Sequence, residues 1–141
     1  MPHAQDEVRL ADVRFTANFA LNLERIEAFW NESGFAEAYD RLLDALSDMV
    51  VPNLERHPGM GRPFLQRTVD SVEAERIAER IASRLSALAR DAQVREYVMD
   101  DYLVLYVHLR DHDLPGVVHL LAIKHQKQLD FDFPSDSADG R

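Results

Sequence analysis

The residue in this sequence best suited to proton transfer is a histidine close to the C-terminal end of the chain. His125 stands between Lys124 and Lys127, the only two lysines of the protein. An unperturbed imidazole titrates near pH ~6.5, so this group is suited to act as an acid or a base under physiological conditions. A structural interpretation is equally open, in which the ring ends a strand and hydrogen bonds to a backbone carbonyl.

A second candidate is an arginine in a glycine-containing loop. Arg62 follows Gly61, and its guanidinium is suited to grip a carboxylate or a phosphate. The alternative is an ion pair that ties the loop to a sheet or a helix, with glycines present for backbone geometry. We favour the structural role for Arg62.

Aromatic and imidazole side chains recur in the C-terminal third of the sequence. Tyr102 and Tyr106 fall on one face of a predicted strand by alternation, with His108 beside them. Core packing accounts for the tyrosines, and a binding surface is the alternative. His108 and His119 fall in apolar strands and are interpreted as core or cross-strand residues, so neither a metal site nor a cofactor is predicted.

Length and composition predict one globular domain. The chain has 141 residues, of which 46% are hydrophobic and 29% charged, and this balance is enough for a substantial core. It contains no cysteine, which excludes disulfides and thiolate zinc sites. The first ten residues lack the apolar stretch of a signal peptide, and no run approaches the ~18 apolar residues of a membrane span. We therefore expect a soluble, cytoplasmic protein without membrane contact.

The net charge of −9 disfavours nucleic acid as a default partner, because phosphate backbones are bound by clustered lysine and arginine. The charge is uneven, however. Residues 56–95 hold eight arginines and five acids, a net of +3, so the remaining residues sum to −12. This basic segment is either a solvated helix face or a local docking site.

The N-terminal half predicts a strand followed by two helices. Residues 12–15 alternate as a short strand, and Thr16 or Asn18 is placed to cap a helix whose apolar stripe is Phe19, Leu23, Ile26 and Trp30. Ser33 and Gly34 end it. A second helix follows, kinked at Pro52 and ended by Pro58 and Gly59, with an apolar face predicted at Phe35, Tyr39, Leu42, Leu43, Leu46 and Met49.

The C-terminal half predicts one more helix and then strands. Residues 70–90 read as a helix with a capping box formed by Asp70 and Glu73. Residues 92–99, 102–110 and 117–125 read as strands, and the middle one is apolar enough to be buried on both faces. The turn residues at 110–116 predict a hairpin loop longer than two residues. Residues 128–133 are expected to add a strand or pack an edge, and 134–141 to be a disordered tail.

Three segments together resemble the RelE/ParE superfamily of type II toxin–antitoxin toxins, which includes plasmid stabilisation proteins. They are HPGMGRPF at 57–64, VREYVMDDYLVLYVHL at 94–109 and VVHLLAIKHQKQLDFDF at 117–133. The resemblance covers about residues 8–133, with the helix at 70–90 as an insertion. It implies an α+β fold of order β-α-α-(α)-β-β-β, in which an N-terminal αα-hairpin packs on a small twisted antiparallel sheet. The single domain would then span 1–133.

The resemblance also implies partners and mechanisms. The partner is a cognate antitoxin whose C-terminal segment wraps the toxin, and a homodimer or a hetero-oligomer with the antitoxin is compatible with it. One branch of the family cleaves messenger RNA on the ribosome, and another poisons DNA gyrase by binding. For cleavage, the resemblance assigns Arg95 and Lys124 as cations and His125 as the proton-transfer group. These three residues are expected in one neighbourhood of the sheet. The other candidates for binding or structural roles are Arg62, Tyr102, Tyr106 and Lys127.

Three hypotheses follow from the sequence. The first is a non-enzymatic, ParE-like toxin that binds DNA gyrase. The second is a ribosome-dependent mRNA endonuclease, which would make the protein an enzyme. The third is a non-toxic interaction protein that retains the fold.

Overall fold

The computed structural model describes residues 9–63 and 93–128, and these form five strands and a run of helices. The strands are β1 (Asp12–Phe15), β2 (Arg62–Pro63), β3 (Gln93–Val98), β4 (Tyr102–Asp111) and β5 (Leu114–His125). The helical segments are α2 (Ala17–Glu32), α3 (Ala36–Ala45), the π-helical turn η1 (Leu46–Val50) and α4 (Val51–Arg56). The predicted helix at 70–90, the extended segment at 128–133 beyond Gln128 and the tail at 134–141 lie outside the described residues.

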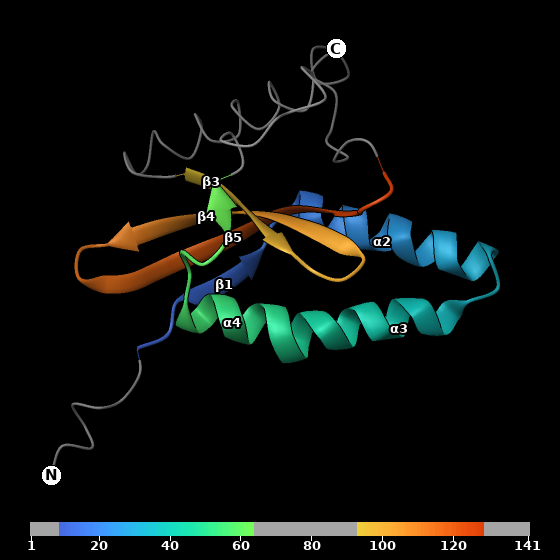
Figure 1. Cartoon of the computed structure of the whole chain (residues 1–141), viewed down its shortest axis with the longest axis horizontal. Coiled ribbons are helices and arrows are strands. Elements are labelled where there is room, and N and C mark those ends of the chain that lie inside the picture. The colour runs from blue at the N-terminus through green and yellow to red at the C-terminus, as the bar shows by residue number, and fades with distance from the viewer. Residues whose placement is uncertain (1–8, 64–92, 129–141) are drawn as a thin grey trace, which may run out of the picture.

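The strands form one sheet in the order β1-β5-β4-β3-β2, and the helical hairpin covers one of its faces (Figure 1). This arrangement confirms the predicted α+β class. The prediction of a purely antiparallel sheet is wrong at one edge, because β1 pairs parallel with β5. A parallel pair needs a long connection rather than a tight hairpin, and here most of the chain lies between the two strands. The alternation of apolar residues in a strand does not reveal whether the strand pairs parallel or antiparallel with its neighbour.

The central strand β4 is buried on both sides, as its sequence predicts. Tyr102, Val104 and Tyr106 belong to the cluster that packs under the helices. Alternation places Leu103, Leu105 and Val107 on the opposite face, and these side chains are also buried. An apolar strand of this kind has no solvated face, which is why its sequence lacks a polar alternation.

Two details of the sheet differ from the predictions. The segment around Arg62, expected to be a loop, pairs with β3 through Arg62 opposite Glu96 and Pro63 opposite Arg95. Proline is tolerated there because β2 is an edge strand. The loop between β4 and β5 is also shorter than expected, since Asp111 pairs with Leu114. His112 adopts a φ of 55°, the positive φ that tight hairpin loops require.

Local signals set the limits of α2. The hydroxyl of Thr16 accepts a hydrogen bond from the backbone N–H of Phe19 at 3.2 Å, so Thr16 is the N-terminal cap. Gly34 follows the helix with a φ of 83°, a conformation that glycine adopts without strain. The predicted helix break at Ser33 and Gly34 is therefore confirmed.

The second helix of the hairpin contains a π-helical turn just before Pro52. Proline lacks the N–H that would bond four residues back, and a wider turn accommodates its absence. A π-helical turn has more residues per turn than an α-helix, so residues spaced by four stay on the same face. The buried positions are therefore Leu42, Leu46, Val50 and Leu54. The predicted face was wrong in part, because the following residues are exposed: Phe35, Leu43 and Met49.

A tight contact joins the end of the helical hairpin to the sheet. The backbone N–H of Gly61 donates to the hydroxyl of Tyr106 at 2.9 Å. A Cβ at Gly61 would lie 2.7 Å from both that hydroxyl and the carbonyl oxygen of Glu96. Only glycine permits this approach of the chain to β3 and β4.

We predict that Gly61→Ala lowers the free energy of unfolding by about 1–3 kcal/mol, since the added methyl group must displace backbone or a buried ring. The matched control is Gly59→Ala, where no atom lies within 4 Å of an added Cβ. Urea denaturation of both variants measures the difference. Equal stabilities for the two variants would contradict the packing described for Gly61.

Candidate functional site

The first element of the site is the line of hydrogen bonds between α2 and β5. The strand β1 pairs with β5 only as far as Leu120, so the edge of β5 beyond that residue has no neighbouring strand. The side-chain amide of Asn18 donates to the carbonyl of Leu121 at 3.0 Å, and the side-chain oxygen of Asn22 accepts from the N–H of Ile123 at 3.0 Å. The helix thus supplies the backbone partners that a sixth strand would otherwise provide.

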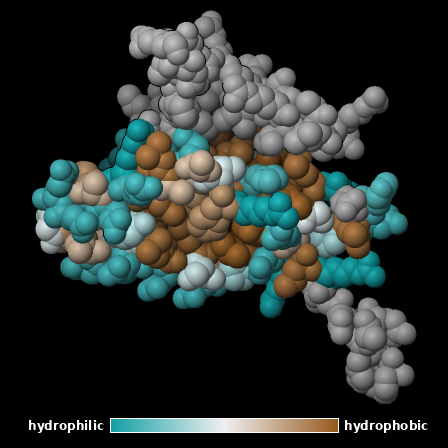
Figure 2. Space-filling model, turned by 180° about the vertical axis from the view of Figure 1, so that it is seen from behind, coloured by the Kyte–Doolittle hydropathy of each residue, from teal (hydrophilic) through white to brown (hydrophobic). Residues whose placement is uncertain are grey.

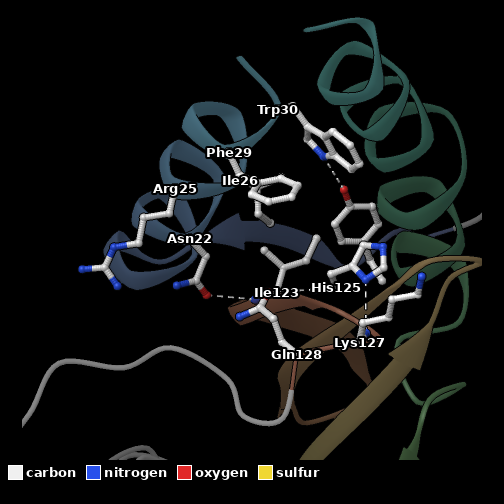
Figure 3. Close-up of a pocket in the computed structure, with 10 residues that line it drawn as sticks. Asn22, Arg25, Ile26, Phe29, Trp30, Ile123, His125, Lys127 and Gln128 are labelled. Atoms are coloured by element: carbon white, nitrogen blue, oxygen red, sulfur yellow. Dashed lines mark hydrogen bonds between the residues drawn. The ribbon is translucent and has the colours of Figure 1, made fainter. Parts of the chain in front are cut away.

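The second element is a cavity of about 510 Å³ that opens between α2 and the end of β5. Ile26, Phe29 and Ile123 lie in its middle, with Arg25 directed outward on one side and Lys127 on the other (Figure 3). The described residues that line it are Asn22, Arg25, Ile26, Phe29, Trp30, Tyr102, Ile123, His125, Lys127 and Gln128. A mainly apolar lining with a few polar groups is typical of a ligand or peptide site.

Polar contacts hold the aromatic wall of this cavity. The indole N–H of Trp30 donates to the hydroxyl of Tyr102 at 3.0 Å, and the Tyr102 ring meets the His125 ring edge to face at 5.2 Å. Burial raises the pKa of Tyr102, and the bond from Trp30 opposes that rise only in part. The phenol therefore stays protonated and neutral at physiological pH, so it cannot serve as a base.

His125 has a defined orientation. Its Nδ1 accepts a hydrogen bond from the backbone N–H of Lys127 at 3.1 Å, so the proton of the neutral ring is on Nε2. The ring lines the cavity, and His125 is the last residue of β5. His125 is therefore a donor towards a ligand in the cavity, and the predicted bond to a backbone carbonyl is replaced by a bond from a backbone N–H.

The structure separates the three residues that the resemblance assigns to cleavage. Arg95 in β3 pairs with Tyr106 of β4, and His125 in β5 pairs with Tyr102 of β4. These two pairing positions are four residues apart along β4, about 13 Å at ~3.3 Å per residue. Arg95 and His125 are also separated across the sheet by two strand spacings of ~5 Å. Lys124 precedes His125 in the strand and points to the opposite face. Its amine donates to the carbonyl of Gln128 at 2.7 Å. The expectation that Arg95 and His125 share a neighbourhood is therefore wrong.

Arg62 and Arg95 instead belong to a contact cluster at the other end of the sheet. Arg62 donates to the buried carboxylate of Glu96 at 2.9 Å through two of its nitrogens. Arg95 donates to the carbonyl of Gly61, beside the hydroxyl of Tyr106. Burial raises the pKa of Tyr106, so its phenol also stays neutral. The structural role favoured for Arg62 and the packing role of Tyr106 are the roles that the contacts show.

Two further histidines have structural surroundings. His108 contacts the carbonyl of Pro115 across the hairpin, and His119 stands in β5 between Arg14 and Val107. Burial lowers the pKa of His119, the positive charge of Arg14 lowers it further, and Asp12 opposes the shift. Within residues 9–63 and 93–128, no three metal-binding side chains gather into a site, and no helix is long and apolar enough to cross a bilayer.

Sequence reasoning missed the part of the cavity that α2 contributes. Trp30 was assigned to the core, while Asn22, Arg25 and Phe29 were not singled out. The available signal was the pair of asparagines at 18 and 22, spaced by one helical turn beside the apolar stripe. A polar pair at that position indicates that the helix bonds to a backbone rather than packing only through apolar groups.

Comparison with known proteins does not assign this chain to a family, since no protein-family model matches it and no curated protein shows significant similarity. The geometry of the site therefore carries the functional argument.

We predict that Asn22→Leu lowers the free energy of unfolding by about 1–3 kcal/mol, because the buried N–H of Ile123 loses its acceptor. The matched control is Asn31→Leu on the exposed side of the same helix, with an expected change within ~0.5 kcal/mol. Chemical denaturation measures both. A cost at Asn31 equal to that at Asn22 would argue against the helix-to-strand bond.

The lowered pKa of His119 predicts a pH-dependent contribution to stability. Above the unfolded-state pKa of ~6.5 the ring is neutral in both states, and its contribution is fully present. As the pH falls below that value, the unfolded chain takes up the proton more readily and this contribution is lost. The difference in unfolding free energy between the native chain and His119→Gln should therefore shrink from pH 7.5 to pH 5.5. A difference that grows on acidification would contradict the assignment.

Proposed function

We propose that this chain is the toxin of a type II toxin–antitoxin pair, of RelE/ParE type, and that it acts by binding a macromolecular target, with DNA gyrase as the first candidate. A cognate antitoxin would neutralise it. The helical hairpin on a small sheet supports the resemblance from which this proposal starts. The RelE/ParE assignment and the toxic activity are themselves parts of the proposal.

The observation that carries the binding mechanism is the contrast between the two ends of the sheet. Two of the residues considered for cleavage, Arg95 and Lys124, donate to backbone carbonyls, and neither lies beside His125 in a common site. The cavity beside α2 instead offers exposed apolar surface. Binding requires such a surface, whereas cleavage of RNA requires cations gathered around the reacting phosphate.

Three aromatic side chains form the core of the proposed interface, and we call them the aromatic patch: Phe29 and Trp30 near the C-terminal end of α2, and Phe35 just before α3. Their rings meet edge to face, with centroids 5.0 Å apart for Phe29 and Trp30 and 6.5 Å apart for Trp30 and Phe35. Phe29 is 57% exposed and Phe35 is 56% exposed. Large aromatic groups left in solvent next to a cavity are typical of an interaction site.

The surface of the molecule also has features that suit a protein partner. Figure 2 shows hydrophobic side chains across the middle of one face of the molecule, flanked by hydrophilic ones. An apolar centre with a polar rim is the common anatomy of a protein interface. The net charge of −9 also favours a protein surface over a nucleic-acid backbone as the partner.

We predict that expression of the chain alone arrests bacterial growth, that co-expression of the neighbouring antitoxin restores it, and that purified chain inhibits gyrase supercoiling. Phe29→Ser with Phe35→Ser should reduce inhibition by about 100-fold or more, because each exposed ring buries apolar area on binding. The control is Leu114→Ser, which removes an exposed apolar side chain at the far end of β5. Normal supercoiling at micromolar protein would remove gyrase as the target, and growth without arrest would remove the toxin function.

A second candidate function is ribosome-dependent mRNA cleavage, because His125, Lys127 and Arg25 line one cavity. In that case expression should halt translation with cleaved codons, and His125→Ala should abolish toxicity while the chain stays folded. A fully toxic His125→Ala variant would exclude this candidate. Harmless expression of a folded chain would instead support the third hypothesis, a non-toxic interaction protein.

A further inference from the structure

Two hydrogen-bond donors at one side of the cavity are not used by the part of the chain that the structure describes. The Nδ1 of His125 accepts from the backbone N–H of Lys127, so the ring hydrogen is on Nε2, where no described residue accepts it. Lys127 is exposed, and its amine forms no hydrogen bond or ion pair with the described residues. Figure 3 shows the two side chains next to each other. Together they offer a directed donor and a positive charge.

The charge of the cavity lining differs in sign from the charge of the whole protein. The chain has a net charge of −9, yet none of the described residues that line the cavity is acidic. Arg25 also lines it but has a contact of its own, so the charge that remains for a ligand is that of Lys127. A single negative charge on the ligand complements this lining, whereas a polyanion would meet the net negative charge of the rest of the molecule.

The rest of the lining is suited to an apolar body. Ile26, Phe29 and Ile123 lie in the middle of the cavity (Figure 3). The hydrogen bond from Trp30 to Tyr102 fixes the aromatic wall beside them, so little side-chain freedom is lost when a ligand binds. The volume of about 510 Å³ lies within the range of ~300–1,000 Å³ that is common for small-molecule sites.

We propose that the cavity between α2 and β5 binds a small organic monocarboxylate with an apolar body. The carboxylate accepts the hydrogen of His125 Nε2 and is attracted by the ammonium group of Lys127. The apolar body contacts Ile26, Phe29 and Ile123. This inference does not rest on the proposed function. Since Phe29 belongs both to the cavity and to the aromatic patch, a bound ligand and a macromolecular partner would compete for that ring.

The test is a titration of the purified full-length chain with simple probes. Trp30 lines the cavity and is the only tryptophan of the protein, so its fluorescence reports binding. Octanoate has both the charge and the apolar body, acetate has the charge alone, and octylammonium has the same chain length with the opposite charge. No target, antitoxin or cell is involved, so failure here is distinguishable from failure of the growth and supercoiling experiments.

Octanoate should bind saturably with a Kd on the order of 1 mM, and acetate should not saturate in the same range. Hexanoate should bind about 10-fold more weakly than octanoate, because it buries two methylene groups fewer. Octylammonium should also bind about 10-fold more weakly, because its charge is repelled by Lys127 and it has no acceptor for His125.

Variants assign the selectivity to the two donors. His125→Phe keeps an aromatic ring beside Tyr102 and removes the donor, so octanoate should weaken about 10-fold while octylammonium is unchanged. Lys127→Glu should weaken octanoate and strengthen octylammonium. The matched control is Arg110→Glu, an exposed charge reversal in β4 away from the cavity, which should leave the ratio of the two affinities unchanged. Circular dichroism verifies that each variant is folded.

Octylammonium binding as tight as that of octanoate would overturn the proposal, and this comparison needs only the native chain. Absence of saturable octanoate binding would overturn it as well. An unchanged octanoate affinity in both His125→Phe and Lys127→Glu would remove the carboxylate from these donors. A Trp30 signal that changes when the chain is diluted without ligand would assign the cavity to a second copy of the chain and would also refute the small-molecule occupant.

Discussion

The arrangement of the site depends on the unpaired edge of β5. Beyond Leu120 this strand no longer pairs with β1, and its backbone groups need other partners because they are buried. Asn18 and Asn22 on α2 satisfy them, while Thr16 caps the same helix and donates to Leu120. These bonds fix the distance and rotation of α2 against the sheet. That position in turn leaves the cavity between the second half of the helix and the end of β5.

The two ends of the sheet therefore differ in the contacts that their side chains make. At one end, Arg62 forms an ion pair with Glu96, and Arg95 and Tyr106 form hydrogen bonds with the backbone of Gly61, which joins the end of the helical hairpin to the sheet. At the other end, aromatic groups and two cations surround an open cavity. The contacts at the first end hold the sheet in place, and the cavity at the second end is the surface on which the proposed binding function relies.

Periodicity predicted most of the elements of the fold. Alternation located β1, β3, β4 and β5, and the stripe from Phe19 to Trp30 located α2, because these patterns are local. The parallel pairing of β1, the edge strand β2 and the π-helical turn were not predicted. Each depends on contacts between distant residues or on the missing N–H of Pro52, and a hydrophobic pattern does not record these.

The candidate site could be predicted only in part. His125, Lys127 and Tyr102 do line one cavity, but Arg95 lies elsewhere, because register and not strand order decides which residues meet across β4. Adjacent residues such as Lys124 and His125 point to opposite faces, so proximity in sequence gave a false grouping. The contribution of Arg25 and Phe29 depends on the rotation of α2, which the bonds of Asn18 and Asn22 determine.

In the proposed function, the chain acts by binding through the cavity and the aromatic patch. Its most direct test is a saturation mutagenesis scan that selects, in growing cells, for variants that have lost toxicity while remaining folded and abundant. If binding is the mechanism, such variants should gather at the exposed positions Arg25, Phe29, Phe35 and Lys127. Tolerance of every substitution at those positions, combined with intolerance at Arg95 and His125, would contradict binding and indicate catalysis.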